Sequence, residues 1–87
     1  MKNTLLPTFY LYTTLGCHLC DDAEAVIQPL FAHLQLSYSK VDIADKDSLV
    51  DIYGVRIPVL QHIATSSELG WPFDSDQLQQ FLLLQCQ

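Results

Sequence analysis

The chain has 87 residues, 49% of them hydrophobic, and four Lys and Arg against ten Asp and Glu give a net charge of −6. This length predicts a single domain over residues 1–87 with its own hydrophobic core, while the negative charge argues against nucleic acid and anionic membranes as partners. Three cysteines, an odd number, do not suit a disulfide-stapled extracellular domain, and we expect neither a secretory signal nor a membrane span but a location in the reducing cytoplasm.

Seven elements are predicted along the chain. Residues 8–13 are aromatic and β-branched and predict a strand, and residues 17 to about 35 carry an apolar stripe of helical period that continues in phase beyond Pro29. Further along, the patterns predict a strand over residues 36–43, a short helix over 45–53, a tight hairpin of strands over 58–63 and 66–69, and a last helix from Asp74.

Local residue types mark the expected helix ends. Asp45 is expected as the N-cap of the short helix, and Gly54 as the left-handed residue that ends it. The spacing of Asp74 and Gln77 suits a capping box at the start of the last helix. Because a β-α-β crossover joins parallel strands, the order β-α-β-α-β-β-α predicts an α/β fold, a four-stranded mixed sheet with helices on both faces.

The two cysteines at the junction of the first strand and helix carry the predicted chemistry. In the run Cys17-His18-Leu19-Cys20 two thiols stand three residues apart, the spacing of a dithiol that cycles with a disulfide. At the helix start the Cys17 sulfur is expected to accept hydrogen bonds from the N–H groups of Leu19 and Cys20, which with the helix dipole favour a thiolate of pKa below about 8.5. Cys17 is therefore predicted to attack, and the less exposed Cys20 to resolve the mixed disulfide.

Alternatives stay open for the residues around this motif. A charged His18 would stabilise the Cys17 thiolate and make the pair more oxidising, or its imidazole is simply exposed. The motif could also be half of a structural zinc site, but the other candidate ligands, His33, His62 and Cys86, stand singly in unrelated elements. We expect no metal, and we interpret Cys86 as a small apolar residue too far along the last helix to resolve Cys17.

Ile57-Pro58 is the second candidate part of the site. A proline at the start of a strand can simply tolerate its missing N–H, or it can follow a cis peptide bond that turns the Ile57 backbone towards a bound peptide. The presence of a dithiol in the same chain favours the second interpretation. The predicted substrate-binding residues are therefore Ile57, Pro58 and the neighbouring Arg56.

Several short motifs occur in an order typical of one family. They are Tyr-Thr before the dithiol, C-H-L-C, Val41-Asp-Ile43, Tyr53-Gly54-Val55, Ile57-Pro58-Val59-Leu60 and a final helix with an acidic start. In these motifs the chain resembles the glutaredoxin branch of the thioredoxin superfamily. The resemblance implies a thioredoxin fold with strand order 2-1-3-4, a cis Pro58 beside the dithiol on a strand antiparallel to the first, and the same roles for Cys17 and Cys20.

Some positions differ from those typical of glutaredoxins that use glutathione. The chain has His18-Leu19 where Pro-Tyr is typical, Thr13-Thr14 where a Lys is, and Gly70-Trp71-Pro72 where a Gly-Gly turn is. Two acids, Asp74 and Asp76, flank the region where the family binds a carboxylate of the peptide, and Arg56 is the nearest cation. Glutathione as a co-substrate therefore stays open.

The residues and the resemblance together predict a dithiol thiol–disulfide oxidoreductase without a bound cofactor. Its expected substrates are protein or low-molecular-weight disulfides, and glutathione or thioredoxin reductase is expected to keep it reduced. The alternative is a non-enzymatic thioredoxin-fold binding module whose C-x-x-C switches an interaction or holds a metal or an iron–sulfur cluster. A two-electron redox midpoint and disulfide turnover without metal would distinguish the enzyme from the binding module.

Overall fold

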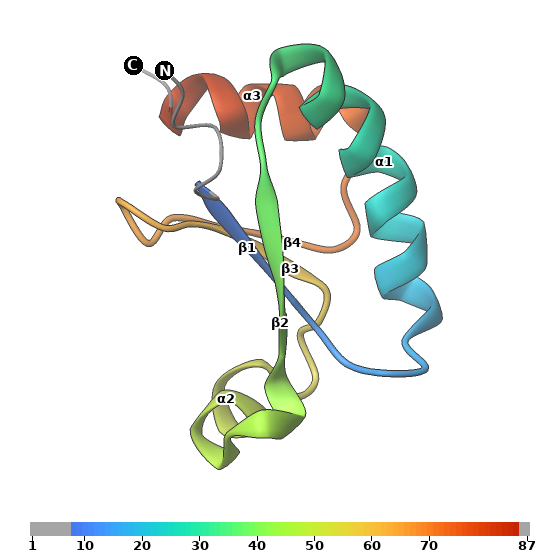
Figure 1. Ribbon diagram of the computed structural model, residues 1–87, viewed down its shortest axis with the longest axis vertical. Coiled ribbons are helices and arrows are strands. Elements are labelled where there is room, and N and C mark those ends of the chain that lie inside the picture. The colour runs from blue at the N-terminus through green and yellow to red at the C-terminus, as the bar shows by residue number, and fades with distance from the viewer. Residues whose placement is uncertain (1–7, 86–87) are drawn as a thin grey trace.

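The computed structural model of the protein describes residues 8–85, and the predicted order β-α-β-α-β-β-α is confirmed (Figure 1). A short 3₁₀ helix, η1, was not predicted and lies between β2 and α2. The elements are β1 (Phe9–Thr13), α1 (His18–Leu34), β2 (Tyr38–Asp42), η1 (Ile43–Asp45), α2 (Asp47–Tyr53), β3 (Val59–His62), β4 (Glu68–Gly70) and α3 (Ser75–Gln85).

The strands form one mixed sheet in the order β2-β1-β3-β4, which confirms the order 2-1-3-4. β1 pairs in parallel with β2 and antiparallel with β3, and β4 returns antiparallel beside β3. β1 is therefore a central strand, and its side chains on both faces meet helices. The register places Tyr12 beside Val59 and Thr13 beside Asp42. The C-terminal ends of β1 and β2 and the start of β3 therefore lie at the same end of the sheet.

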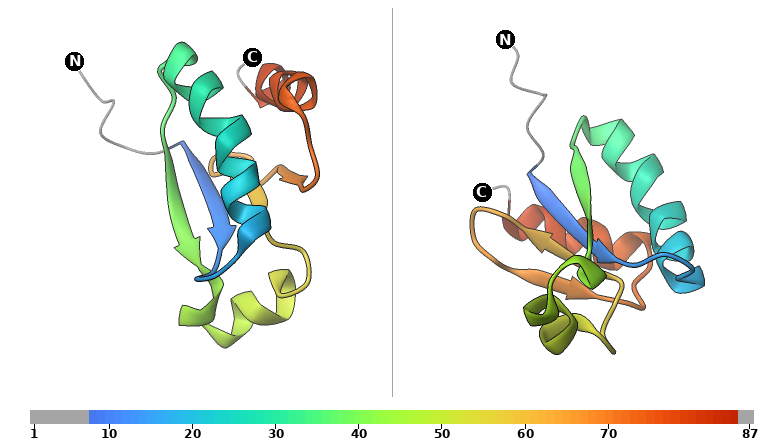
Figure 2. Two further views of the ribbon diagram at one scale, coloured as in Figure 1. Left: turned by 90° about the vertical axis from the view of Figure 1, so that its right-hand side faces the viewer. Right: turned by 60° about the horizontal axis from the view of Figure 1, so that its bottom comes forward.

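Helices cover both faces of the sheet, as predicted (Figure 2). α1 and α3 pack on one face, where the central strands contribute Phe9, Leu11 and Leu60 to the larger core. α2 packs on the other face, where the Tyr53 ring stacks on Tyr12 with centroids 4.1 Å apart. Alternation along a strand explains this division, because successive side chains point to opposite faces.

α1 runs unbroken through Pro29, as its apolar stripe predicted. It ends at Gln35, whose φ of 58° is left-handed, and the N–H of Leu36 donates to the carbonyl of Phe31 at 2.8 Å. This hydrogen bond holds Leu36 to the helix end, as in a Schellman-type ending. It is one reason why β2 begins at Tyr38 rather than at the predicted residue 36.

The predicted start of the short helix was wrong, whereas the helix ends at Tyr53 before Gly54 as predicted and only the left-handed conformation of Gly54 was wrong. α2 begins at Asp47 and has no side-chain cap, while Asp45 belongs to η1, whose N-cap is Asp42. Asp45, which was expected to cap the helix, therefore lies in the turn that follows β2. Gly54 keeps right-handed angles, with φ −49° and ψ −41°, and a Cβ there would stand 2.5 Å from the Val50 carbonyl oxygen. The glycine serves close backbone approach rather than a left-handed turn.

The hairpin and the last helix follow the prediction more closely. β4 begins at Glu68 instead of residue 66, because Ser66 has a φ of 64° in the turn and its N–H donates to the His62 carbonyl at 2.8 Å. At the start of α3 the Asp74 carboxylate accepts from the Gln77 N–H at 2.8 Å. The Gln77 side chain in turn accepts from the Asp74 N–H at 3.0 Å. The capping box is confirmed.

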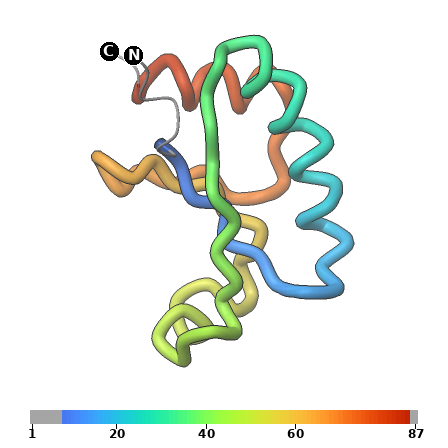
Figure 3. The backbone as a smooth tube through the Cα atoms, viewed as in Figure 1, coloured from blue at the N-terminus to red at the C-terminus, as the bar shows by residue number. Residues whose placement is uncertain are grey.

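The loop between β1 and α1 and the loop between α2 and β3 lie at the same end of the molecule (Figure 3). The first loop contains Cys17, and the second contains Ile57 and Pro58. Because β1 and β3 are neighbours in the sheet, the two loops leave adjacent strand ends. The fold thus brings together two segments that are about forty residues apart in the chain.

Candidate redox site

The loop before α1 places Cys17 at the helix N-terminus. Gly16 turns the chain with a φ of 78°, and the Cys17 N–H donates to the Thr14 carbonyl at 3.4 Å. Cys17 itself is the extended N-cap residue, with φ −84° and ψ 101°, and α1 starts at His18. The position predicted for Cys17 is confirmed.

Cys17 and Cys20 are joined as a disulfide across the first turn of α1, with their Cα atoms 5.2 Å apart. The Cys20 N–H donates a hydrogen bond of 3.1 Å to Cys17 Sγ, one of the two donors that the sequence predicted. The helix cap shows no matching bond from Leu19. Cys17 is partly exposed and Cys20 is only 2% exposed, so the expected difference in access to the two sulfurs is present.

The loop before β3 has the backbone that the resemblance implied. The Ile57–Pro58 peptide bond is cis, and Pro58 is fully buried. The Trp71–Pro72 bond is also cis, which was not predicted. The Trp71 N–H donates to the Pro58 carbonyl at 3.2 Å and so connects the end of β4 to this loop.

A groove of about 450 Å³ lies between the dithiol turn and the two proline loops. Leu19, between the two cysteines, is about half exposed and forms one wall, and the other walls come from residues 55–57, Val59 and residues 70–72. Val55 is fully exposed and Trp71 partly so. The groove therefore brings Leu19 of the dithiol motif together with the predicted binding residues Ile57 and Arg56, while Pro58 lies buried behind them.

Arg56 is held in place by three contacts beside the groove, and its Nη1 donates a hydrogen bond of 3.4 Å to the Ile52 carbonyl. Its Nη2 lies 2.6 Å from Glu68 Oε1, and its guanidinium carbon lies 5.2 Å from the centre of the Tyr53 ring. Glu68 also accepts from the Tyr53 hydroxyl at 2.6 Å. Burial raises the pKa of Glu68, but hydrogen bonds from Tyr53 and Arg56 and the Arg56 charge outweigh it and bring that pKa below its ordinary value. Glu68 is therefore ionised near neutral pH.

A smaller hollow of about 270 Å³ adjoins Cys17 on the side of β2. Its polar walls include Asp21, Asp42 and Glu24, and Glu24 pairs with Lys40 at 3.1 Å. Burial raises the pKa of Glu24, but hydrogen bonds from Tyr38 and Lys40 outweigh it, and the pKa lies below its ordinary value. These contacts bind α1 to β2 beside the dithiol.

The Thr14 hydroxyl donates to Asp42 Oδ1 at 3.1 Å, which attaches the dithiol loop to the end of β2. The same oxygen accepts from the Ala44 N–H at 2.9 Å. Thr14, Asp42 and Glu68 were not predicted as supports of the site. The position of Asp42 directly after a parallel strand was a usable signal, whereas no local pattern pointed to Glu68.

The histidines do not come together. His18 is exposed at the first position of α1, His62 pairs with Thr65 through Nδ1 at 2.9 Å, and His33 lies at the far end of α1. Within residues 8–85 no group of three or more His, Cys, Asp or Glu side chains is placed to hold a metal ion. The prediction for Cys86 lies outside the described residues.

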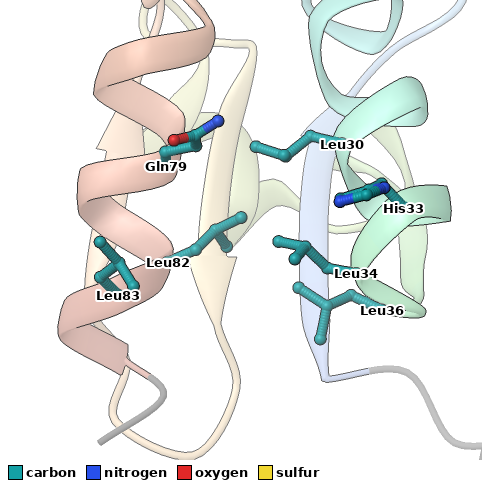
Figure 4. A pocket seen from close by; sticks show the side chains of 7 residues that line it. All are labelled: Leu30, His33, Leu34, Leu36, Gln79, Leu82 and Leu83. Carbon is teal, nitrogen blue, oxygen red and sulfur yellow. The ribbon is translucent and has the colours of Figure 1, made fainter.

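A separate hollow of about 450 Å³ lies between α1 and α3. Figure 4 shows Leu30 and Leu34 of α1 pointing toward α3, where Leu82 and Gln79 face them. His33 is the only titratable side chain among the seven residues that line it, and no thiol lines it. The hollow offers no redox chemistry, and the candidate site is the dithiol turn with its groove.

A thioredoxin-type sheet with a C-x-x-C disulfide at the start of its first helix, beside a strand led by a cis proline, defines a thioredoxin-fold protein of redox type. Residues 8–83 match the family described as glutaredoxin-like domain (DUF836), and the chain belongs to that family. No curated protein matches it. Among the described residues, none of the helices has the length and apolar character needed to cross a membrane.

The chain is similar to solved structures of a protein from X. campestris and of one from Nitrosomonas europaea. The X-ray structure of the structural-genomics target protein XcR50 from X. campestris is 36% identical, has a TM-score of 0.73, and the match covers 87% of this chain and 96% of that one. The solution structure of XcR50 gives 35% identity, a TM-score of 0.77 and coverages of 88% and 94%. Protein Ne2328 from Nitrosomonas europaea is 28% identical, with a TM-score of 0.74 and coverages of 93% and 98%.

Proposed function

We propose that this protein is a dithiol thiol–disulfide oxidoreductase in which Cys17 attacks the substrate disulfide and Cys20 resolves the mixed disulfide. The observation that supports this best is the position of Cys17, partly exposed at the N-cap of α1 and bonded to the buried Cys20. Free N–H groups and the helix dipole stabilise negative charge at that position. The sulfur that a substrate can reach is thus also the one on which a thiolate is favoured.

The reaction consists of two exchanges. The Cys17 thiolate attacks one sulfur of the substrate, which forms a mixed disulfide and releases a thiolate that takes up a proton. The Cys20 thiol then loses its proton and attacks Cys17 Sγ, which releases the second substrate thiol. Two electrons have passed to the substrate, and the protein is left with the Cys17–Cys20 disulfide. Two equivalents of a monothiol, or one dithiol, return it to the reduced form.

The groove is the proposed docking edge for the substrate. Ile57 and Arg56 line it together with Leu19, and the buried Pro58 holds the loop in place. An extended peptide laid along residues 55–57 would pass beside the turn that contains the disulfide. His18 is proposed to tune the redox potential, since a positive charge at the exposed helix start favours the thiolate of Cys17.

The substrates are proposed to be protein or low-molecular-weight disulfides, and the reductant either glutathione or thioredoxin reductase. Such a cycle needs a reducing compartment, and the proposal places the protein in the cytoplasm. The decisive measurement is NADPH oxidation with the metal-free protein and insulin or hydroxyethyl disulfide as substrate. One arm supplies glutathione with glutathione reductase, and the other supplies thioredoxin reductase.

Turnover in one arm, lost in Cys17→Ser, is the expected result and names the reductant. The Cys86→Ser variant is the matched control, because it removes a thiol outside the motif and should keep turnover. A pure protein that reduced no disulfide in either arm, and that carried a metal lost on alkylation, would contradict the proposal and favour the binding module.

A further inference from the structure

We propose that Glu68 sets the charge selectivity of the groove, so that it accepts neutral and apolar disulfides in preference to anionic ones such as oxidised glutathione. The rate measurements that test this charge selectivity rest on the proposed function, because they need the protein to react with disulfides. Glu68 is on the edge strand β4, and it is not among the residues that line the groove.

The wall of the groove is almost entirely apolar. Of the described residues that line it, Arg56 is the only one with a charged side chain. The other lining residues are Leu19, Val55, Ile57, Val59, Gly70, Trp71 and Pro72. An anionic substrate would therefore depend on Arg56 for electrostatic attraction. Whether the groove attracts anions is decided by what surrounds that guanidinium.

Glu68 forms an ion pair with the guanidinium of Arg56. The Nη2 to Oε1 distance is 2.6 Å, and the Tyr53 hydroxyl donates to the other oxygen of Glu68 at 2.6 Å. Gln61 adds a third donor at 3.4 Å. The carboxylate is thus fixed from several directions, and its side chain is 26% exposed against 47% for Arg56.

The contacts keep Glu68 ionised and cancel the Arg56 charge at neutral pH. Hydrogen bonds and the neighbouring cation lower the pKa of Glu68 despite its partial burial. A neutral ion pair attracts a third charge only weakly, while the chain as a whole carries a net charge of −6. A disulfide with carboxylates gains little at this groove, whereas one with apolar flanks can contact Leu19, Val55 and Trp71.

The experiment compares disulfides that differ in charge. The reduced protein is oxidised in single turnovers by oxidised glutathione, which is anionic, by neutral hydroxyethyl disulfide, and by cationic cystamine. Wild type is compared with Glu68→Gln, which keeps the size and hydrogen-bonding oxygen of the side chain but leaves Arg56 uncompensated. The measured quantity is the ratio of the rate with each charged disulfide to the rate with the neutral one.

For Glu68→Gln the glutathione ratio should rise about two- to fivefold and the cystamine ratio should fall, the size expected for an exposed charge contact. Both changes should shrink at high salt, because exposed charges are screened. Adding Arg56→Gln to Glu68→Gln should return the ratios towards wild type. Asp45→Asn is the matched control, since it makes the same change in net charge at an exposed residue of η1 away from the groove.

A binding measurement separates this inference from the proposed function. Trp71 is the only tryptophan of the chain and lines the groove, so its fluorescence reports binding of the unreactive anion S-methylglutathione to the oxidised protein. Glu68→Gln should bind it about two- to fivefold more tightly than wild type. Tighter binding without turnover of any disulfide would overturn the proposed oxidoreductase and uphold the charge selectivity. If Glu68→Gln changed the rates with all three disulfides equally, or left the binding of S-methylglutathione unchanged, the charge selectivity would be overturned. The proposed oxidoreductase would not be affected by that result.

Discussion

The backbone N–H of Cys20 donates a hydrogen bond of 3.1 Å to Cys17 Sγ across the first turn of α1. The sulfur of Cys17 thereby takes the place of the side-chain oxygen that usually caps a helix N-terminus. Because this contact and the helix dipole act on Cys17 and not on Cys20, the two thiols of the reduced protein are expected to differ in reactivity.

Serine substitutions should separate attack from resolution. Cys17→Ser removes the proposed nucleophile and is expected to abolish disulfide exchange. Cys20→Ser should still attack but should accumulate a mixed disulfide with its partner, because the group that resolves it is gone. Mass spectrometry of each variant after incubation with a disulfide peptide measures this. A stable peptide adduct on Cys17→Ser at Cys20 would reverse the assignment.

The reduced protein should be alkylated first at Cys17. Its sulfur is partly exposed at the helix start, while Cys20 is 2% exposed. At neutral pH we expect one fast and one slow modification by iodoacetamide, located by peptide mapping. Equal rates at the two cysteines would show that the exposure seen in the disulfide form is not kept after reduction. Unfolded protein is the control, since there the difference should vanish.

Gly16→Ala should destabilise the protein by about 1–2 kcal/mol, the cost of left-handed backbone for a residue with a Cβ. Gly16 has a φ of 78°, and nothing lies within 4 Å of a Cβ added there, so the cost is conformational and not steric. Gly70→Ala is the matched control, because Gly70 has equal space and no positive φ. Urea unfolding measures both variants. Equal effects at the two positions would contradict this explanation.

Acid should weaken the attachment of α1 to β2 through Glu24. Hydrogen bonds from Tyr38 and Lys40 hold its pKa below the ordinary 4.5 in the folded protein. The folded state therefore binds this proton less readily than the unfolded state, and its stabilisation is present above about pH 4.5 and lost as the pH falls through the folded pKa. Glu24→Gln should show a shallower loss of unfolding free energy in acid than wild type. An acid dependence equal to that of wild type in Glu24→Gln would contradict this explanation.

A rise in pH should destabilise the folded protein through Tyr38. Burial and the hydrogen bond to Glu24 raise its pKa to about 12, against 10.0 for the ordinary group. The folded protein keeps this proton where the unfolded chain loses it, so stability is full below about pH 10 and falls as the pH rises towards 12. Tyr38→Phe should make the alkaline unfolding curves shallower, while Tyr53, whose pKa is also raised by burial and its hydrogen bond to Glu68, keeps the remaining slope. Tyrosinate absorbance of wild type should show a late-titrating group that is absent from the variant.

Local sequence patterns predicted the elements that depend on near neighbours. The helical stripe, the capping box of Asp74 and Gln77, and the position of Cys17 before α1 were confirmed. Each of these depends on residues within about one helical turn, where spacing determines which groups meet. The family resemblance added the strand order and the cis bond before Pro58, which spacing alone left open.

The short helix shows where local patterns failed. Asp45 was predicted to cap the helix and Gly54 to end it with left-handed angles, yet Asp45 lies in η1, and Gly54 ends α2 with right-handed angles close to the Val50 backbone. Preferences describe what a residue tolerates, and the path of the chain between β2 and β3 decides which conformation is needed. That path depends on where α2 packs on the sheet, which no short window of sequence contains.

By itself the sequence determined that two thiols would stand at the start of a helix in a β-α-β-α-β-β-α chain, because that follows from local spacing. Only the tertiary structure decided what surrounds them. The bond from Thr14 to Asp42 spans 28 residues, and the pair of Arg56 with Glu68 spans 12. Such contacts form only when the register of the sheet has aligned the strand ends and the turns have positioned the loops between them. The two residues of each contact therefore cannot be predicted from one segment of the sequence.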